Sequence, residues 1–169
     1  MKTLAAGLFA VALAAVPLSA GQEPEPVDMN QLMDDFARET ASNDVHLLIV
    51  HLNDKTTDAL FQPPQKYSLR AQARGQTMFF VQGTALRDAT LELDFQLTET
   101  GALGVSTHRP RMISIQGMEN GTELTEGDQF LGILALNSLL PLRSRLVLID
   151  GLMRLEFEFS PNVLRQLQD

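Results

Sequence analysis

Cysteine is absent from the sequence of 169 residues, so no disulfide stabilises the fold and side-chain packing alone must do so. Tryptophan is also absent, and Tyr67 is the only tyrosine. Sugars and nucleic-acid bases commonly stack on these two kinds of aromatic ring, so surfaces that bind by such stacking are scarce in this chain.

Basic residues are few: 13 Lys and Arg stand against 21 Asp and Glu, and the formal net charge is −8. No cluster of Lys or Arg interrupts this acidic composition. Proteins bind nucleic acid and anionic lipid mainly by neutralising phosphates, so we expect neither as a partner.

Histidine occurs three times, which leaves little material for a metal site. His46 and His51 are five residues apart, so on one strand they point to opposite faces of the sheet and cannot bind the same metal ion. His108 is far away in the sequence. Because cysteine is missing as well, we expect no metal and no cofactor.

The only long apolar run lies at the N-terminus. Lys2, an apolar run over residues 4–16 and small residues ending at Ala20 have the layout of a secretory signal peptide. We predict a signal peptide over residues 1–20, with cleavage after Ala20 or after Gly21. An uncleaved N-terminal anchor helix is the alternative, although the apolar run is shorter than a bilayer-spanning helix requires.

No other run is long and apolar enough to cross a bilayer, so we expect no transmembrane segment in the mature chain. An exported chain without disulfides fits a bacterial periplasm better than an extracellular space, and we predict one of these two locations. Residues 21–27, rich in Pro and Glu, are predicted to form a flexible linker. Residues 28–169 are predicted to form a single globular domain.

A helix is predicted to begin after Asp28. This residue is a good N-cap, Gln31 completes a capping box, and Val27 can pack against Leu32. Apolar residues then recur at helical spacing, and Asn43 is the predicted C-cap. The resulting amphipathic helix is expected to pack on a sheet, or alternatively to dock on a partner.

Several segments have the patterns of strands. Residues 45–52 are nearly all apolar, which predicts a central strand, whereas alternation predicts half-buried strands at 67–73 and 91–98. Residues 77–82 and 111–116 are further candidates. Glu92 and Asp94 would lie on the outward face of the 91–98 strand, where pairing with Arg70 and Arg74 is possible.

The segment 143–159 contains the clearest hairpin signal, because two apolar runs flank Asp150-Gly151. A two-residue loop of type I′ would place Ile149 opposite Leu152. The charged pairs of this predicted register are Arg145 with Glu156 and Arg143 with Glu158. One face is then apolar and comprises Leu146, Leu148, Met153, Leu155, Phe157 and Phe159.

A second hairpin is predicted at Asn120-Gly121, between strands at 112–115 and 122–124. Residues 128–140 fit two structures. Their Leu and Ala content and the N-cap Asp128 favour a buried helix that Pro141 ends, whereas Gly132 and the nearby final hairpin favour a strand over 130–136. Helix is the preferred interpretation.

No catalytic motif is present. Ser106 and His108 are neighbours in sequence, but no strand-turn-helix elbow surrounds the serine, so a polar loop explains them. The carboxylate pairs Asp34-Asp35 and Glu92 with Asp94 are expected to be solvated, with a cleft at Glu92 or Asp94 as the alternative. Asn120-Gly121-Thr122 matches a glycosylation acceptor, but the turn already accounts for it.

These patterns predict an α+β, mainly β fold: an N-terminal amphipathic helix packed on a curved antiparallel sheet, a sandwich or partial barrel of about seven to nine strands that ends in a β-hairpin. Three functions follow. The first is a non-catalytic exported domain that binds a protein in the cell envelope through an apolar patch or an unpaired edge strand. The second is a carrier of an apolar small molecule or lipid, which requires an enclosed apolar pocket. The third is an enzyme of unrecognised type.

Overall fold

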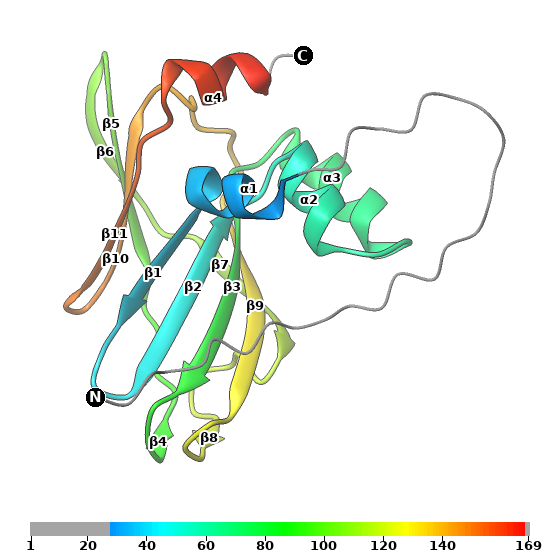
Figure 1. Ribbon diagram of the computed structural model, residues 1–169. Helices are drawn as coiled ribbons and strands as arrows, with labels where there is room; N and C mark the ends of the chain where they lie inside the picture. Colours follow the sequence, from blue (N-terminus) through cyan, green and yellow to red (C-terminus); the bar gives the residue numbers. More distant parts are fainter. Residues whose placement is uncertain (1–27, 168–169) are drawn as a thin grey trace, which may run out of the picture.

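The computed structural model describes residues 28–167, and the predicted signal peptide and linker lie outside this range. The described chain is mainly β, as predicted, and its antiparallel sheets do not close into a barrel (Figure 1). The helices are α1 (Met29–Phe36), α2 (Asp54–Leu60), α3 (Gln65–Ala73) and α4 (Pro161–Gln166). The strands are β1 (Ala37–Ala41), β2 (Val45–His51), β3 (Met78–Ala85), β4 (Ala89–Thr90), β5 (Gln96–Gly101), β6 (Gly104–His108), β7 (Arg111–Gln116), β8 (Glu123–Leu124), β9 (Gln129–Ala135), β10 (Arg145–Asp150) and β11 (Met153–Phe157).

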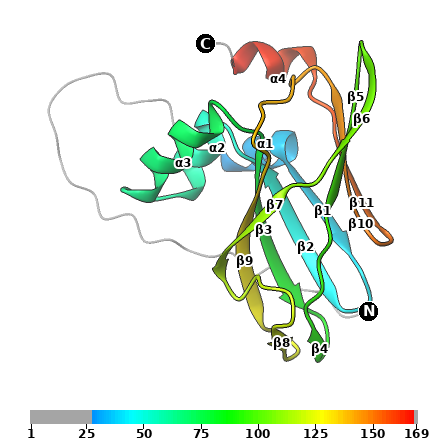
Figure 2. The same cartoon turned by 180° about the vertical axis from the view of Figure 1, so that it is seen from behind.

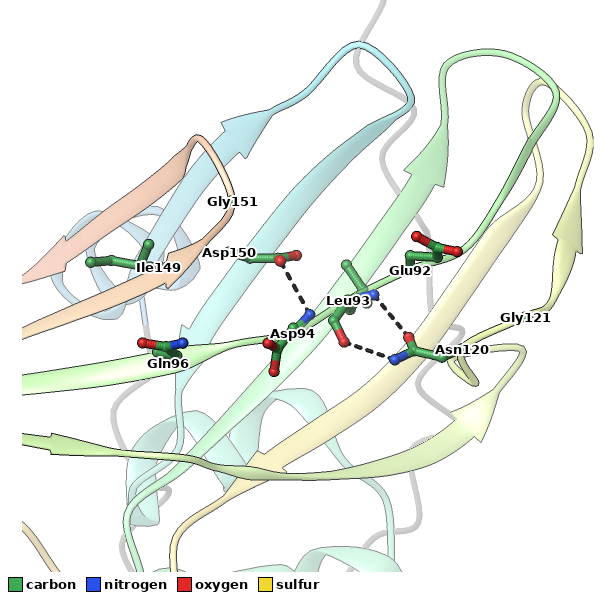
Figure 3. A pocket seen from close by; sticks show the side chains of 9 residues that line it. All are labelled: Glu92, Leu93, Asp94, Gln96, Asn120, Gly121, Ile149, Asp150 and Gly151. Atoms are coloured by element: carbon green, nitrogen blue, oxygen red, sulfur yellow. Dashed lines mark hydrogen bonds between the residues drawn. The ribbon is translucent and has the colours of Figure 1, made fainter.

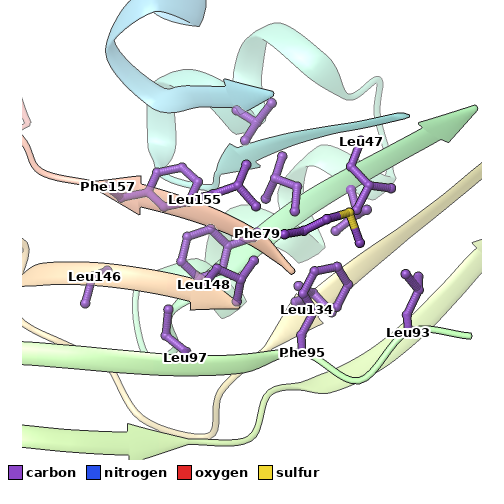
Figure 4. Close-up of a cluster of buried hydrophobic side chains, with 14 of the residues drawn as sticks. Leu47, Phe79, Leu93, Phe95, Leu97, Leu134, Leu146, Leu148, Leu155 and Phe157 are labelled. Carbon is purple, nitrogen blue, oxygen red and sulfur yellow. The ribbon is translucent and has the colours of Figure 1, made fainter. Parts of the chain in front are cut away.

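Two sheets share one hydrophobic core. The first has the strand order β1-β2-β3-β9-β7 and the second has the order β11-β10-β5-β6, while β4 and β8 form a small separate pair. Side chains from both sheets meet between them, as Figure 4 shows. The rings of Phe79 on β3 and Phe157 on β11 lie with centroids 5.0 Å apart, so the two sheets are in direct contact.

The two sheets are tied together along one side. There, β1 and β11 lie side by side, and Arg38 donates from Nε to the carbonyl oxygen of Glu156 over 2.9 Å. The same guanidinium group lies 5.5 Å from the ring centroid of Phe157, a cation–π distance. Along the other side, β6 ends one sheet and β7 ends the other, and the chain passes directly between them at Arg109-Pro110 (Figure 2).

The helix α1 begins after Asp28, whose carboxylate accepts hydrogen bonds from the backbone N–H groups of Asn30 and Gln31. Leu32 and Phe36 are its buried residues. The helix ends at Phe36, so the predicted C-cap at Asn43 is wrong. Residues 37–41 pair with β2 instead, because strand pairing in the folded domain outweighs the local helical spacing.

The strand predicted over residues 67–73 is wrong, because these residues belong to the helix α3. Leu69 and Ala73 are four residues apart and pack on a small apolar cluster beside the first sheet. The possible pairing of Arg70 and Arg74 with Glu92 and Asp94 required two neighbouring strands, so it does not form. Both arginines instead bind Asp54 of α2, at 3.2 and 2.8 Å, and so connect the two helices.

Residues 129–135 form the strand β9, so the preferred helical interpretation of residues 128–140 is wrong and the strand alternative is correct. The strand lies between β3 and β7, and most of its residues are buried on both faces, which removes the alternation that marks a strand. Gly132 fits here because a Cβ atom would lie 2.2 Å from Sδ of Met118.

The final hairpin, β10 and β11, buries the predicted apolar face, but the predicted register is wrong by two residues. Asp150 pairs with Met153, so the loop is Gly151-Leu152. Only Gly151 has a positive φ, of +56°, which is the pattern of a type II′ turn rather than type I′. Arg145 and Glu156 still form an ion pair, now along the diagonal of the hairpin.

The second predicted hairpin, at Asn120-Gly121, is also wrong in its pairing. The strand β7 pairs with β9, and β8 pairs with β4, so the two segments that flank this turn do not pair with each other. Gly121 does adopt a positive φ, of +90°, so the turn itself is present.

Gly83 provides a test of the packing between β3 and β9. It lies opposite Phe130, and a Cβ atom on Gly83 would lie 2.0 Å from the ring atom Cζ of that buried side chain. We expect Gly83→Ala to lower the free energy of unfolding by about 1–3 kcal/mol, measured by urea denaturation.

Gly75 offers a matched control, because the nearest atom to its added Cβ would be the Gln72 carbonyl oxygen at 3.9 Å. Gly75→Ala is expected to leave the stability nearly unchanged. Equal effects of the two substitutions would contradict the close approach of Gly83 to Phe130.

Candidate functional site

The residues that precede β5 form one wall of a surface cavity of about 890 Å³. Figure 3 shows it between this segment, the turn at Gly121 and the β10–β11 hairpin. Its lining residues are Glu92, Leu93, Asp94, Gln96, Asn120, Gly121, Ile149, Asp150 and Gly151. Glu92 and Asp94 therefore border a hollow of the surface, and the alternative that one of them lines a working cleft stays a prediction.

The predicted strand 91–98 is only partly correct. Burial alternates as predicted, with Leu91 and Leu93 inside and Glu92 and Asp94 outside, but the hydrogen-bonded strand begins at Gln96. Asn120 binds the extended part from the side, as Figure 3 shows. Its Oδ1 accepts from the N–H of Leu93 over 2.8 Å, and its Nδ2 donates to the carbonyl oxygen of Leu93 over 2.9 Å. This side chain takes the place of a neighbouring strand.

Asp150 faces the same cavity, although its place beside Gly151 in the sequence predicts only a turn residue. Its Oδ1 accepts from the backbone N–H of Asp94 over 3.1 Å. Within residues 28–167, its Oδ2 is buried and has no hydrogen-bond partner. Burial raises the pKa of this carboxyl above its ordinary value, and the nearby carboxylate of Asp94 raises the pKa further, against the opposing effect of the hydrogen bond.

Carboxylates of this cavity do not converge on a metal site. In the part of the chain that the structure describes, no group of three or more His, Asp or Glu side chains is suited to hold a metal ion. The nearest cation to Asp94 is that of Arg109, with Nη2 3.7 Å from Oδ2. The cavity is an acidic hollow whose hydrogen bonds hold backbone segments in place.

A second cavity, of about 540 Å³, lies beside the hairpin of β5 and β6. Its walls combine apolar, hydroxyl and charged groups from this hairpin and from the turn before β10. The lining residues are Glu99, Gly101, Ala102, Leu103, Gly104, Val105, Ser106, Pro141, Arg143 and Ser144.

Glu99 is the centre of a polar cluster at this cavity. Its Oε1 accepts from the hydroxyl of Ser144 over 2.8 Å, and its Oε2 accepts from the hydroxyl of Ser106 over 3.2 Å. The Oγ of Ser106 also lies 3.0 Å from Nε2 of His108. Ser106 and His108 are both part of β6, so the prediction that they lie in a polar loop is wrong.

The contact of Ser106 with His108 does not form a catalytic triad. In a triad the carboxylate binds the imidazole nitrogen that faces away from the serine. Here the Glu99 carboxylate lies 3.8 Å from Nε2, the same nitrogen that approaches Ser106. The cluster therefore joins neighbouring strands through polar contacts without the geometry that activates a serine.

The strand β6 is the most exposed strand of the second sheet. Four of its five residues are exposed, and His108 is the only one of intermediate burial. Val105 is 70% exposed, and Leu103 at the hairpin tip is fully exposed. In the described chain β6 pairs only with β5, so its other edge carries free backbone groups.

His46 and His51 point to opposite faces of β2, as predicted. His46 is partly exposed and lies 3.6 Å from a carboxylate oxygen of Glu39. His51 is buried, with the rings of Phe79 and Phe159 at centroid distances of 5.3 and 5.2 Å. This burial lowers the pKa of His51 to about 4.

The buried histidine predicts a specific dependence of stability on pH. Because its folded-state pKa is lowered, the unfolded chain takes up a proton first as the pH falls below about 6.5. We expect roughly 3 kcal/mol of unfolding free energy to be lost between about pH 6.5 and pH 4. His51→Leu should remove most of this slope in urea denaturation at a series of pH values, and an unchanged slope would show that another group causes it.

The raised pKa of Asp150 predicts a pH dependence of stability opposite to that of His51. Its raised pKa means that ionisation disfavours the folded state, so stability should fall as the pH rises through the range in which this carboxyl loses its proton. Asp150→Asn keeps an oxygen acceptor for the Asp94 N–H without the charge. We expect this variant to have a higher Tm than the parent at pH 7, with the difference shrinking at low pH. A lower Tm at pH 7 would show that the ionised carboxylate is stabilising.

None of the helices within residues 28–167 has the length and apolar character that a membrane span requires. No protein family, no curated protein and no solved structure matches this chain significantly.

Proposed function

We propose that this chain is a non-catalytic, exported domain of the periplasm that binds a protein partner in the cell envelope through the β5–β6 hairpin. The observation that supports this function is the exposed edge of β6, with Leu103 and Val105 beside it. Free backbone groups and exposed apolar side chains on one edge strand are the features by which sheets recruit other chains.

The other edges of the two larger sheets are less suited to strand addition. The edges β1 and β11 lie against each other, and Arg38 donates a hydrogen bond to the carbonyl oxygen of Glu156. The edge β7 has an irregular register between Ser114 and Gln116, and such bulges discourage strand addition. Pro110, which lies between β6 and β7, has no backbone N–H that an added strand could bind. These features leave β6 as the regular, accessible edge.

The carrier and enzyme functions have weaker support. An apolar ligand needs an enclosed apolar pocket, whereas the space between the sheets is filled by buried side chains and both cavities described above have charged walls. An enzyme needs a nucleophile or acid–base pair in working geometry, which the cluster at Ser106 lacks.

A photo-crosslinking amino acid placed at Leu103 in the native host tests the proposal. We expect it to link the chain to a discrete envelope protein, and Val105→Asp in the same chain should abolish that adduct because it places a charge in the contact.

Leu152 supplies the control position, because it is equally exposed but lies at the tip of the other hairpin. Adducts that are equal at Leu103 and Leu152, or that persist with Val105→Asp, would contradict a binding site on the β5–β6 hairpin.

A further inference from the structure

The backbone of β6 presents two residues to an incoming strand. The two-residue loop Ala102-Leu103 joins β5 to β6, and the pair that closes it, Gly101 with Gly104, is hydrogen-bonded. From there, non-hydrogen-bonded and hydrogen-bonded pairs alternate along the two strands. The hydrogen-bonded positions of β6 are therefore Gly104, Ser106 and His108. The backbone N–H and C=O groups of Val105 and Thr107 point away from β5, where another strand can bind them.

A pocket adjoins this edge. The 540 Å³ cavity places the apolar groups of Leu103, Val105 and Pro141 on the same walls as the cation of Arg143. In strand addition, backbone hydrogen bonds supply affinity and side-chain pockets beside the edge supply specificity. This pocket fits an apolar side chain together with a neighbouring carboxylate.

Charge selects the kind of strand that fits. Arg143 lies at the hairpin end of β6, and Arg109 and Arg111 lie at its other end. Within residues 28–167, Arg143 and Arg111 form no ion pair, whereas Arg109 has only an exposed contact with Asp94 at 3.7 Å. Both ends of the edge thus carry arginines although the whole chain is acidic. The carboxylate of Glu99, which lines the same pocket as Arg143, already accepts hydrogen bonds from Ser106 and Ser144.

A second copy of this chain fits the edge poorly. A two-fold contact joins the same patch of both copies. Antiparallel pairing of two β6 strands would bring Arg143 of one copy toward Arg109 and Arg111 of the other, so like charges would face each other.

We infer that β6 accepts an extended segment of another protein as an added strand, and that this segment alternates apolar residues with acidic ones. The inference rests on the proposed function and adds to it the mode of binding and the chemistry of the partner. Acidic residues of the segment bind the arginines at the two ends of β6, and one apolar residue enters the pocket at Val105.

The test uses two soluble peptides with blocked ends. One alternates valine with glutamate, and the other is identical except that lysine replaces each glutamate. Each is titrated into the isotopically labelled chain, with binding followed by the amide chemical shifts of β5 and β6. We expect the acidic peptide to shift these amides and the basic peptide to leave them unchanged.

Thr107→Pro removes an outward N–H without removing a bond to β5, and prolines are tolerated at such edge positions. It should weaken binding of the acidic peptide by about tenfold, whereas Thr107→Ala, which retains the N–H, should bind as the parent does. Arg143→Glu should weaken it by about fivefold, and Arg143→Lys much less. Val105→Pro is the second backbone variant if Thr107→Pro proves unstable by circular dichroism.

Equal binding by Thr107→Pro and Thr107→Ala would overturn strand addition while leaving the cross-link at Leu103 as separate support for the proposed function. Binding of the basic peptide in preference, or of neither peptide, would overturn the inferred chemistry of the segment. A dimer of the parent chain in sedimentation that Thr107→Pro dissociates would show that a second copy occupies the edge, which also overturns the inference.

Discussion

Contact between aromatic rings joins the two sheets, and the rest of the structure depends on it. Phe79 of β3 meets Phe157 of β11 at 5.0 Å, and Phe159 beyond β11 meets both His51 and Phe36. These contacts connect the first sheet, the second sheet and α1 in a chain that has no disulfide. Aromatic pairs of this kind contribute about 0.5–1.5 kcal/mol each beyond the burial of their area.

Joining the sheets along this side determines which edges remain free. With β1 held against β11 by Arg38, the opposite side of the core is bordered by β6 and β7. The chain changes sheets between these strands at Arg109-Pro110, and such a corner needs a bend. The bend lets β6 pair with β5 and β7 pair with β9, while the outer edge of β6 stays accessible.

The sequence pattern correctly predicted the segments that have one buried face and one water-exposed face. The buried face of the final hairpin, the opposed His46 and His51, and the alternating burial of residues 91–97 all follow from period-two spacing. The strand β9 lacks this spacing because both of its faces are covered. In α3, Leu69, Ala71 and Ala73 satisfy strand spacing, while Leu69 and Ala73 also satisfy helical spacing, so the pattern could not distinguish the two structures.

Contacts between distant segments were beyond the reach of local pattern. The sequence identified Glu92 and Asp94 as residues of a possible cleft, but the cavity also needs Asp150, which lies 56 residues beyond Asp94. Ser106 and His108 are neighbours in the sequence, yet their place on an edge strand depends on how β5, β10 and β7 are ordered. An edge exists only once the whole sheet is known, so single-sequence reasoning could predict that an open edge would occur but not that β6 would provide it.

Hydrogen exchange of the β6 amides, followed residue by residue by NMR, tests most directly whether this edge is open. The pairing with β5 predicts slow exchange for Ser106 and His108, whose N–H groups bind β5, and fast exchange for Val105 and Thr107, whose N–H groups face outward. Uniform protection of all four amides in the isolated chain would contradict an open edge at β6 and, with it, the proposed mode of partner binding.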